Sequence, residues 1–300
     1  MSRRVLLVWM ACGCGRLGFD ETAANVFEPD AASDGGVMEM SNCWAAWRTS
    51  SFSLAAPVML DTLAVGNQRL SNPVLSATSL SLSYVSNTGL GDIMIAMRTA
   101  IDRPWMPTGP IAELETPDEE GRFATTPDEL LGIYVRGTPL QLVETRRTTT
   151  GEAWGPPSPA PFVANTSVTN LYDPEITQDG LRLYYSNGTN LLVATRASRD
   201  DAFAAPQIVE VAATSPSDPV VSPDEQVMVF SSPGVTLRDL YIATRDHADG
   251  MFGPPMKLPG PLINTDMNDE GDADLSTDGC ELVFSSNRNG RQIWSSRVMQ

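Results

Sequence analysis

Three aspartates occupy matching positions in successive copies of a repeated segment. Asp173, Asp218 and Asp272 each lie just before a short stretch that is predicted to form a β-strand. Aligning the copies places Asn72 and Arg122 at the same position. If the copies surround one axis as blades of a propeller, these five side chains lie at the mouth of a central channel.

Carboxylates that converge on a channel have three alternative interpretations. They could bind a cation or a basic partner, because hard cations such as calcium prefer oxygen ligands. They could form an acid/base set, because glycosidases use two carboxylates roughly 5 to 9.5 Å apart. Alternatively, they only cap turns, as aspartate before proline does in Asp173-Pro174 and Asp218-Pro219.

A second acidic stretch, DMNDEGDAD, resembles part of a calcium-binding loop. Asp266, Asn268 and Glu270 fall at positions 1, 3 and 5, and Gly271 follows at the turn position. The acidic residue expected at position 12 is replaced by Thr277. A weak calcium site and a solvated loop between blades are therefore the two alternatives. Apart from calcium, no cofactor is expected.

Several classes of chemistry lack the residues that they need. His247 is the only histidine, so a histidine-dependent catalytic triad or a histidine zinc site is not expected. The sequence contains no glycine-rich phosphate loop and no dinucleotide fingerprint. The net charge of -17 repels nucleic acids and anionic membranes and attracts cations or basic partners.

The repeat that carries the aspartates organises the chain. A segment from Asp173 to Phe203 recurs at 218–252 and 272–297, with weaker copies upstream. An arginine ends the third segment of each copy, and an aromatic residue follows it. The aromatic residues are separated by 49 positions at each step, from 105 to 154, 203 and 252. The arginines are Arg98, Arg146, Arg196, Arg245 and Arg297, and the aromatic residues are Trp105, Trp154, Phe203 and Phe252.

Each copy is predicted to form four short antiparallel strands, and radial repetition of such units makes an all-β propeller. First strands are expected near 73–77, 123–126, 174–177, 219–222 and 273–276. Fourth strands are expected near 52–60, 105–114, 154–163, 203–211 and 252–260. Five blades therefore result if Phe52–Leu60 pairs with Arg291–Val298 and closes the ring. Because Cys43–Arg48 resembles a further third strand, six blades are the alternative.

The turns SPDE and TDG, each followed by VFSS or a similar strand, the loop SNRNG and the strand LYIATR resemble the Pro-Asp, WD-repeat-like repeats of TolB-like β-propellers. This resemblance covers about residues 50–300. It implies a propeller in an exported bacterial protein of the cell envelope, and it carries no catalytic residue. In the resemblance, Thr78 and Ser79 replace Asp-Gly in the first copy.

The N-terminus has the layout of a secretory signal. Arg3 and Arg4 precede the apolar run Val5–Ala11, which is too short to span a bilayer. Cys12 or Cys14 is a candidate for lipidation, and an ordinary signal sequence or no signal are the alternatives. We expect a signal at 1–14, a flexible acidic tether at 15–41 and the propeller at 42–300. Such a protein would be an outer-membrane lipoprotein or would lie in the periplasm or at the cell surface.

Cys43 and Cys280 are the two cysteines of the expected mature domain, and they either form a disulfide or remain free thiols. The overall prediction is a monomeric, non-catalytic binding or scaffolding propeller whose partner is an envelope protein or a glycan. The only expected membrane contact is the lipid anchor. The alternative is a glycan-active enzyme that uses Asp173, Asp218 and Asp272.

Overall fold

The computed structural model describes residues 43–49, 52–64, 66–87, 91–162, 170–234 and 237–299. All of them belong to one unit, Met40–Gln300. The expected signal sequence with Cys12 and Cys14, and the expected tether, lie outside the described residues. The helices of the described part are two single turns of three residues, and neither is long enough to cross a membrane.

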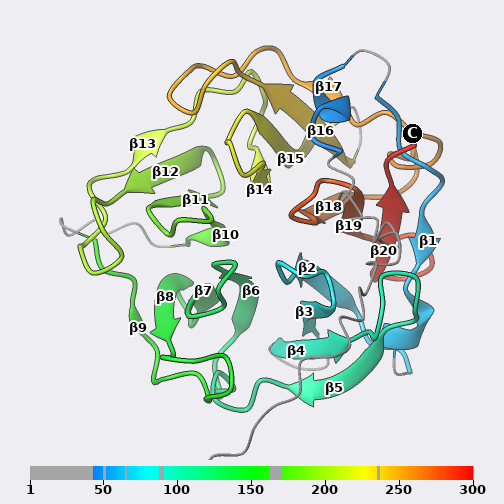
Figure 1. Cartoon of the computed structure of the whole chain (residues 1–300). Helices are drawn as coiled ribbons and strands as arrows, with labels where there is room; N and C mark the ends of the chain where they lie inside the picture. The colour runs from blue at the N-terminus through cyan, green and yellow to red at the C-terminus, as the bar shows by residue number, and fades with distance from the viewer. Residues whose placement is uncertain are drawn as a thin grey trace, which may run out of the picture. The chain divides into compact units, whose positions relative to one another are not determined.

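The described strands form five antiparallel sheets of four strands each, arranged as blades around an axis with the first strand of each blade innermost (Figure 1). Blade 1 contains β2 (Leu70–Leu75), β3 (Ser81–Ser86), β4 (Asp92–Met97) and β5 (Met106–Pro110). Blade 2 contains β6 (Glu120–Thr125), β7 (Leu131–Arg136), β8 (Gln141–Arg146) and β9 (Ser158–Pro159). Blade 3 contains β10 (Tyr172–Ile176), β11 (Arg182–Ser186), β12 (Leu191–Thr195) and β13 (Gln207–Ile208). Blade 4 contains β14 (Ser217–Val221), β15 (Val227–Pro233), β16 (Arg238–Thr244) and β17 (Met256–Lys257). Blade 5 contains β18 (Glu270–Leu275), β19 (Glu281–Ser286), β20 (Gln292–Arg297) and β1 (Val58–Met59). The prediction of an all-β propeller with five four-stranded blades is confirmed.

The turn between the first two strands is fixed by a Ser/Thr-x-Asp motif. In blade 3, the hydroxyl of Thr177 donates to Asp179 (2.6 Å), and the same carboxylate accepts the N–H of Leu181 (2.9 Å). Blades 2, 4 and 5 repeat both bonds at their own turns. Aspartate side chains stabilise turns in this way, so the motif sets where the second strand begins.

The 49-residue spacing of the aromatic residues has a direct structural cause. In each of blades 1 to 4, a guanidinium lies 4.3 Å from the centre of the aromatic ring seven positions later. Arg146 ends the third strand of blade 2 as predicted, but the arginine that stacks on the ring is its neighbour Arg147. Arg146 turns outward instead, to Glu144 and the exposed Asp200.

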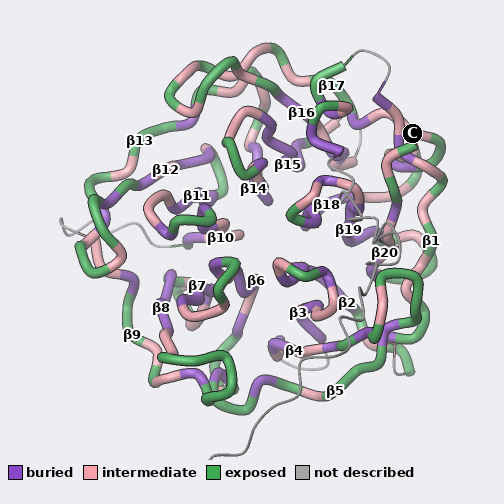
Figure 2. Tube along the Cα trace, in the orientation of Figure 1, coloured by how far each residue is buried: buried purple, intermediate pink, exposed green. Residues whose placement is uncertain are grey.

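The ring closes as predicted, because a strand from the N-terminal part of the chain completes the last blade. Val58 pairs with Ser295 and Met59 with Trp294, and Leu54 forms a further bridge to Val298. The hydrogen-bonded strand β1 is shorter than the predicted closing strand, as are the fourth strands β9, β13 and β17. Figure 2 shows the reason, because residues of the outermost strands are mainly exposed whereas every residue of β18 and β19 is buried. The outer strands bury little apolar surface that would extend them.

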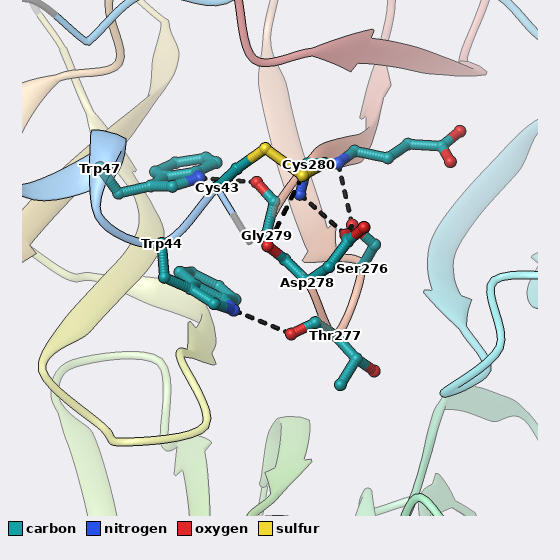
Figure 3. Close-up of a disulfide and its surroundings, with 9 residues drawn as sticks. Cys43, Trp44, Trp47, Ser276, Thr277, Asp278, Gly279 and Cys280 are labelled. Atoms are coloured by element: carbon teal, nitrogen blue, oxygen red, sulfur yellow. Dashed lines mark hydrogen bonds between the residues drawn. A yellow bond between two sulfur atoms is a disulfide. The ribbon is translucent and has the colours of Figure 1, made fainter. Parts of the chain in front are cut away.

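Residues 43–48 do not begin a sixth blade, so that alternative was wrong. They form a strap that ends in the short helix η1 (Ala46–Arg48). The indole N–H groups of Trp44 and Trp47 donate to the carbonyls of Thr277 (2.8 Å) and Gly279 (2.7 Å) in the turn of blade 5 (Figure 3). Two tryptophans that anchor a turn through their ring nitrogens cannot also alternate sides as residues of a strand do.

The structure joins Cys43 and Cys280 in a disulfide that links this strap to blade 5 (Figure 3). The backbone N–H of Cys43 also donates to the carbonyl of Asp278 (2.9 Å). The strap is therefore attached at the turn that closes the first hairpin of the last blade. It stabilises the same blade that β1 completes.

Candidate functional site

A β-bulge interrupts the first strand of every blade. In four blades the first bulged residue has a positive φ: 51° at Asn72, 55° at Asp173, 55° at Asp218 and 50° at Asp272. Asparagine and aspartate adopt this left-handed conformation more readily than other non-glycine residues. The residue type at these positions is therefore favoured by the backbone as well as by any ligand.

The bulges direct three aspartates to the axis of the ring. One carboxylate oxygen each from Asp173, Asp218 and Asp272 lies within 4.8 Å of the others. We call these residues the mouth trio. They line a pocket of about 290 Å³ together with Arg238 and Arg291. Asp218 and Asp272 are 5% and 6% exposed, and Asp173 is half-buried.

Hydrogen bonds connect the trio to neighbouring blades. The backbone N–H of Asp218 points to the carboxylate of Asp173 (3.4 Å), and that of Asn72 points to Asp272 (3.3 Å). Asn72 thus joins the predicted ring through its backbone. The hydroxyls of Ser231 and Ser285 donate to Asp218 and Asp272, respectively.

The members of the trio differ in their electrostatic environment. Burial and the nearby carboxylate of Asp218 raise the pKa of Asp173 well above its ordinary value. Burial acts in the same direction on Asp272, but the guanidinium of Arg291 (2.5 Å) and the hydroxyl of Ser285 outweigh it and lower the pKa of that carboxyl. Of Asp173 and Asp272, Asp173 is therefore the one whose negative charge is more costly.

Arg122 is the second residue of its bulge, so it does not share the positive φ of the four residues at the mouth. The bulge of blade 2 lies between Glu120 and Phe123, one residue further from its turn than in the other blades. The guanidinium of Arg122 instead reaches across the axis, below the mouth trio, to the carbonyls of Pro174 (3.2 Å) and Ala273 (2.9 Å). The expected position was wrong because alignment by turns cannot detect a displaced bulge.

Arg122 is the centre of a second group of charges, which the sequence analysis did not identify. Its guanidinium lies 3.0 Å from Asp274 and 3.4 Å from Glu175, and its side chain is fully buried. We call Arg122, Glu175 and Asp274 the deep cluster. Burial raises the pKa of Glu175 to about 8 and that of Asp274 to about 6, although Arg122 opposes both shifts.

The deep cluster borders a small cavity of about 80 Å³ that Trp44 of the strap also lines. A signal for the cluster was present in the sequence, since Glu175 and Asp274 follow Asp173 and Asp272 by two residues. Residues two apart in a strand point to the same face. The acidic pairs DPE and DAD therefore indicate two levels of carboxylates along one channel.

The stretch that resembles a calcium loop has protein partners of its own. The carboxylate of Glu270 is fully buried and accepts from Thr265 (3.0 Å), Ser286 (3.0 Å) and Arg288 (2.9 Å). The amide of Asn268 donates to Thr265 (2.9 Å). Calcium binding by Asp266, Asn268 and Glu270 stays a prediction, and the contacts described for Glu270 are structural.

Comparison with known proteins gives structural likenesses alone. No family model matches the chain, and no curated protein matches its sequence.

Among solved structures, the chain is similar to a GH62 hydrolase in complex with xylotriose, with 10% identity, a TM-score of 0.54 and coverage of 83% of this chain and 97% of the hydrolase. It is also similar to a family 117 glycoside hydrolase from the marine bacterium Zobellia galactanivorans, with 12% identity, a TM-score of 0.54 and coverage of 82% and 90%.

TolB from Acinetobacter baumannii matches with 11% identity and a TM-score of 0.46, over 79% of this chain and 56% of that protein. The chain thus spans little more than half the length of that TolB. At such identities, structural likeness reports the fold and not the function. The five four-stranded sheets and the strand pairing that closes their ring establish that the chain is a five-bladed β-propeller.

Proposed function

We propose that the chain is a non-catalytic binding module of the bacterial cell envelope whose mouth trio accepts a positively charged group of its ligand. The observation that carries this proposal is the approach of three carboxylate oxygens to within 4.8 Å at an open pocket. Among the described side chains, Arg291 pairs closely with Asp272, whereas Asp173 and Asp218 have no ion-pair partner within 4.0 Å. A cation at this position would relieve the repulsion that raises the pKa of Asp173.

An ammonium or guanidinium group of a partner protein and a calcium ion share the required chemistry. Both offer positive charge, and calcium accepts several carboxylate oxygens at once. The net charge of -17 also attracts basic partners over a longer range.

Residence in the envelope is supported by two features of the chain. A disulfide between Cys43 and Cys280 persists in oxidising compartments. The basic and apolar residues at the N-terminus have the layout of a secretory signal, with Cys12 or Cys14 as the lipidated residue. Metabolic labelling with palmitate tests the lipid anchor. One of the two variants Cys12→Ser and Cys14→Ser should lose the label, namely the one that removes the lipidated cysteine.

The binding proposal is tested by thermal unfolding of the wild type and of Asp218→Asn. We expect the melting temperature of the wild type to rise with calcium or with a lysine-rich peptide, because a ligand that binds only the folded state stabilises it. The substitution should weaken the response. If neither cation shifts the melting temperature of the wild type, the mouth trio is a set of turn caps and the proposal fails.

A glycan-active enzyme is the second candidate, favoured by the opposite pKa shifts of Asp173 and Asp272. Such a split is what separates a general acid from a base or nucleophile. However, Asp218 and Asp272 are almost fully buried, and the oxygens lie closer together than the roughly 5–9.5 Å between glycosidase carboxyl groups. Hydrolysis of a glycan panel by the wild type, with its loss in Asp173→Asn, would replace the binding proposal with this one.

A further inference from the structure

The arginines that stack on the aromatic ring seven positions later also join the blades, with one exception. Arg98 binds Glu281 of blade 5 (2.6 Å), and Arg196 binds Glu144 of blade 2 (3.1 Å). Arg245 donates to the hydroxyl of Tyr184 in blade 3 (2.9 Å). The side-chain hydrogen bonds described for Arg147 all remain within blade 2, to Glu129 and the carbonyl of Glu152.

The junction between blades 3 and 4 shows how a phenol fills this position. Tyr184 is fully buried, and its hydroxyl donates to Glu225 while it accepts from Arg245. Its ring packs with Met228 and Phe230 of blade 4. Burial raises the pKa of Tyr184 to about 12, so the hydroxyl keeps the proton that it donates.

The junction between blades 1 and 2 has the same polar partners in the same places. Glu129 and Glu225 both follow the turn with a positive φ (53° and 55°) and accept the Nε–H of the arginine through their carbonyls (2.7 and 2.6 Å). Arg147 lies over Trp154 as Arg245 lies over Phe252, at 4.3 Å in both cases. The carboxylate of Glu129 also pairs with Arg147 (3.0 Å).

The residue that differs is the one in the preceding blade. Ser83 pairs with Val74 just after the bulge of β2, as Tyr184 pairs with Glu175 just after the bulge of β10. Serine therefore stands in blade 1 where blade 3 has the phenol. The charged pair of blade 2 is correspondingly more exposed, at 12% for Arg147 and 33% for Glu129, against 7% and 12% for Arg245 and Glu225.

A cavity of about 340 Å³ lies at this junction, and Ser83, Phe123, Glu129, Arg147 and Trp154 all line it. Phe123 does not take the place of the missing phenol. Its ring lies over Gly132, where an added Cβ would come within 2.3 Å of Cε2. Gly132 occupies the position that Met228 has in blade 4, since both follow the first residue of the second strand.

We propose that this cavity binds the side chain of a tyrosine from a partner polypeptide, with the hydroxyl between Glu129 and Arg147 and the ring against Phe123 and Trp154. A phenol suits the pair because it can donate to the carboxylate and accept from the guanidinium at once. A carboxylate ligand would meet the negative charge of Glu129. A phenyl ring without a hydroxyl would bury the pair without a polar partner.

The test uses the full chain and N-acetyl-tyrosinamide as the probe, with N-acetyl-phenylalaninamide as the matched compound, and calorimetry or NMR titration as the readout. The tyrosine compound should bind at least tenfold more tightly than the phenylalanine compound. Glu129→Gln should weaken its binding several-fold. Glu225→Gln makes the same change at the junction that Tyr184 occupies, and it should leave the affinity unchanged.

Ser83→Tyr supplies the phenol from within the chain, so it should abolish probe binding and raise the melting temperature. Should this variant fail to fold, the Glu129→Gln result decides. Equal affinity for the two compounds, the absence of binding by the wild type, or unchanged affinity in Glu129→Gln would each overturn the proposal.

Discussion

The mouth trio and the deep cluster both place carboxylates from β10 and β18 near the axis, but the surroundings give them different roles. The trio lines a pocket of about 290 Å³, and only Asp272 of its members has an ion-pair partner among the described residues. The deep cluster borders a cavity of about 80 Å³ that Trp44 also lines, and its carboxylates pair with a fully buried arginine. Acidic residues at a channel are therefore candidates for binding where they line a pocket large enough for a ligand and lack a buried cation of the protein. Below that level they hold the blades together.

The largest expected effect comes from removal of the central cation of the deep cluster. In Arg122→Met, Glu175 and Asp274 lose their buried partner, which costs about 3–5 kcal/mol of unfolding free energy. Chemical denaturation at neutral pH measures the loss. Arg291→Gln is the matched change at the mouth, and because the side chain of Arg291 is 28% exposed, its cost should be about 1 kcal/mol. Equal losses in the two variants would show that the two levels do not differ.

The next effect is at the strap, whose Trp44 lines the same cavity as Glu175 and Asp274. Replacing both Cys43 and Cys280 by serine should lower the free energy of unfolding by about 2–4 kcal/mol, because a long loop is no longer closed. Denaturation with and without reductant measures the change, and reductant should have no effect on the variant. Alkylation of two free thiols in protein isolated without reductant would contradict the disulfide.

The pH dependence of stability separates the carboxyls of the deep cluster from Asp272 of the mouth trio. The folded pKa of Glu175 is about 8, above its ordinary value of 4.5, and that of Asp274 is about 6. Between the ordinary pKa and the raised pKa of each group, the folded protein therefore binds more protons than the unfolded chain. The free energy of unfolding consequently falls as pH rises from about 5 to 8. Glu175→Gln should flatten this slope in denaturation curves measured across the window.

The contribution of Asp272 to stability has the opposite pH dependence, and it falls in a lower pH range. Because its pKa is lowered from 3.8, it contributes stability that is lost only as pH falls through the folded value. Asp272→Asn should therefore leave the slope between pH 5 and 8 in place. A slope that disappears in this variant would assign the titration to the mouth.

The smallest expected effect is at the half-buried member of the trio. Asp173→Asn should change the free energy of unfolding by less than about 1 kcal/mol, since it removes repulsion from Asp218 while asparagine tolerates the φ of 55°. The melting temperature is the measurement. Asp173→Ala is the control and should be less stable, because alanine lacks the local hydrogen bonds that support this backbone conformation. A large loss in Asp173→Asn would make the trio as structural as the deep cluster.

The sequence by itself determined the elements that depend on local chemistry and on repetition. Ser/Thr-x-Asp turns and the aromatic residues every 49 positions recur because each blade needs the same turn and the same stacked arginine. The complementary missing strands were sufficient to predict that residues near Val58 close the last blade. The domain has two cysteines, and the sequence left a disulfide and two free thiols as the alternatives.

Only the tertiary structure decided which charges meet and how deeply they lie. A bulge displaced by one residue moves Arg122 out of the ring at the mouth, and no local sequence pattern reports such a shift. Blade 1 has Ser83 where blade 3 has Tyr184, and this difference matters only because the neighbouring blade presents Glu129 and Arg147 to that position. Distances across the axis and burial arise from all five blades together, whereas a repeat specifies one blade at a time.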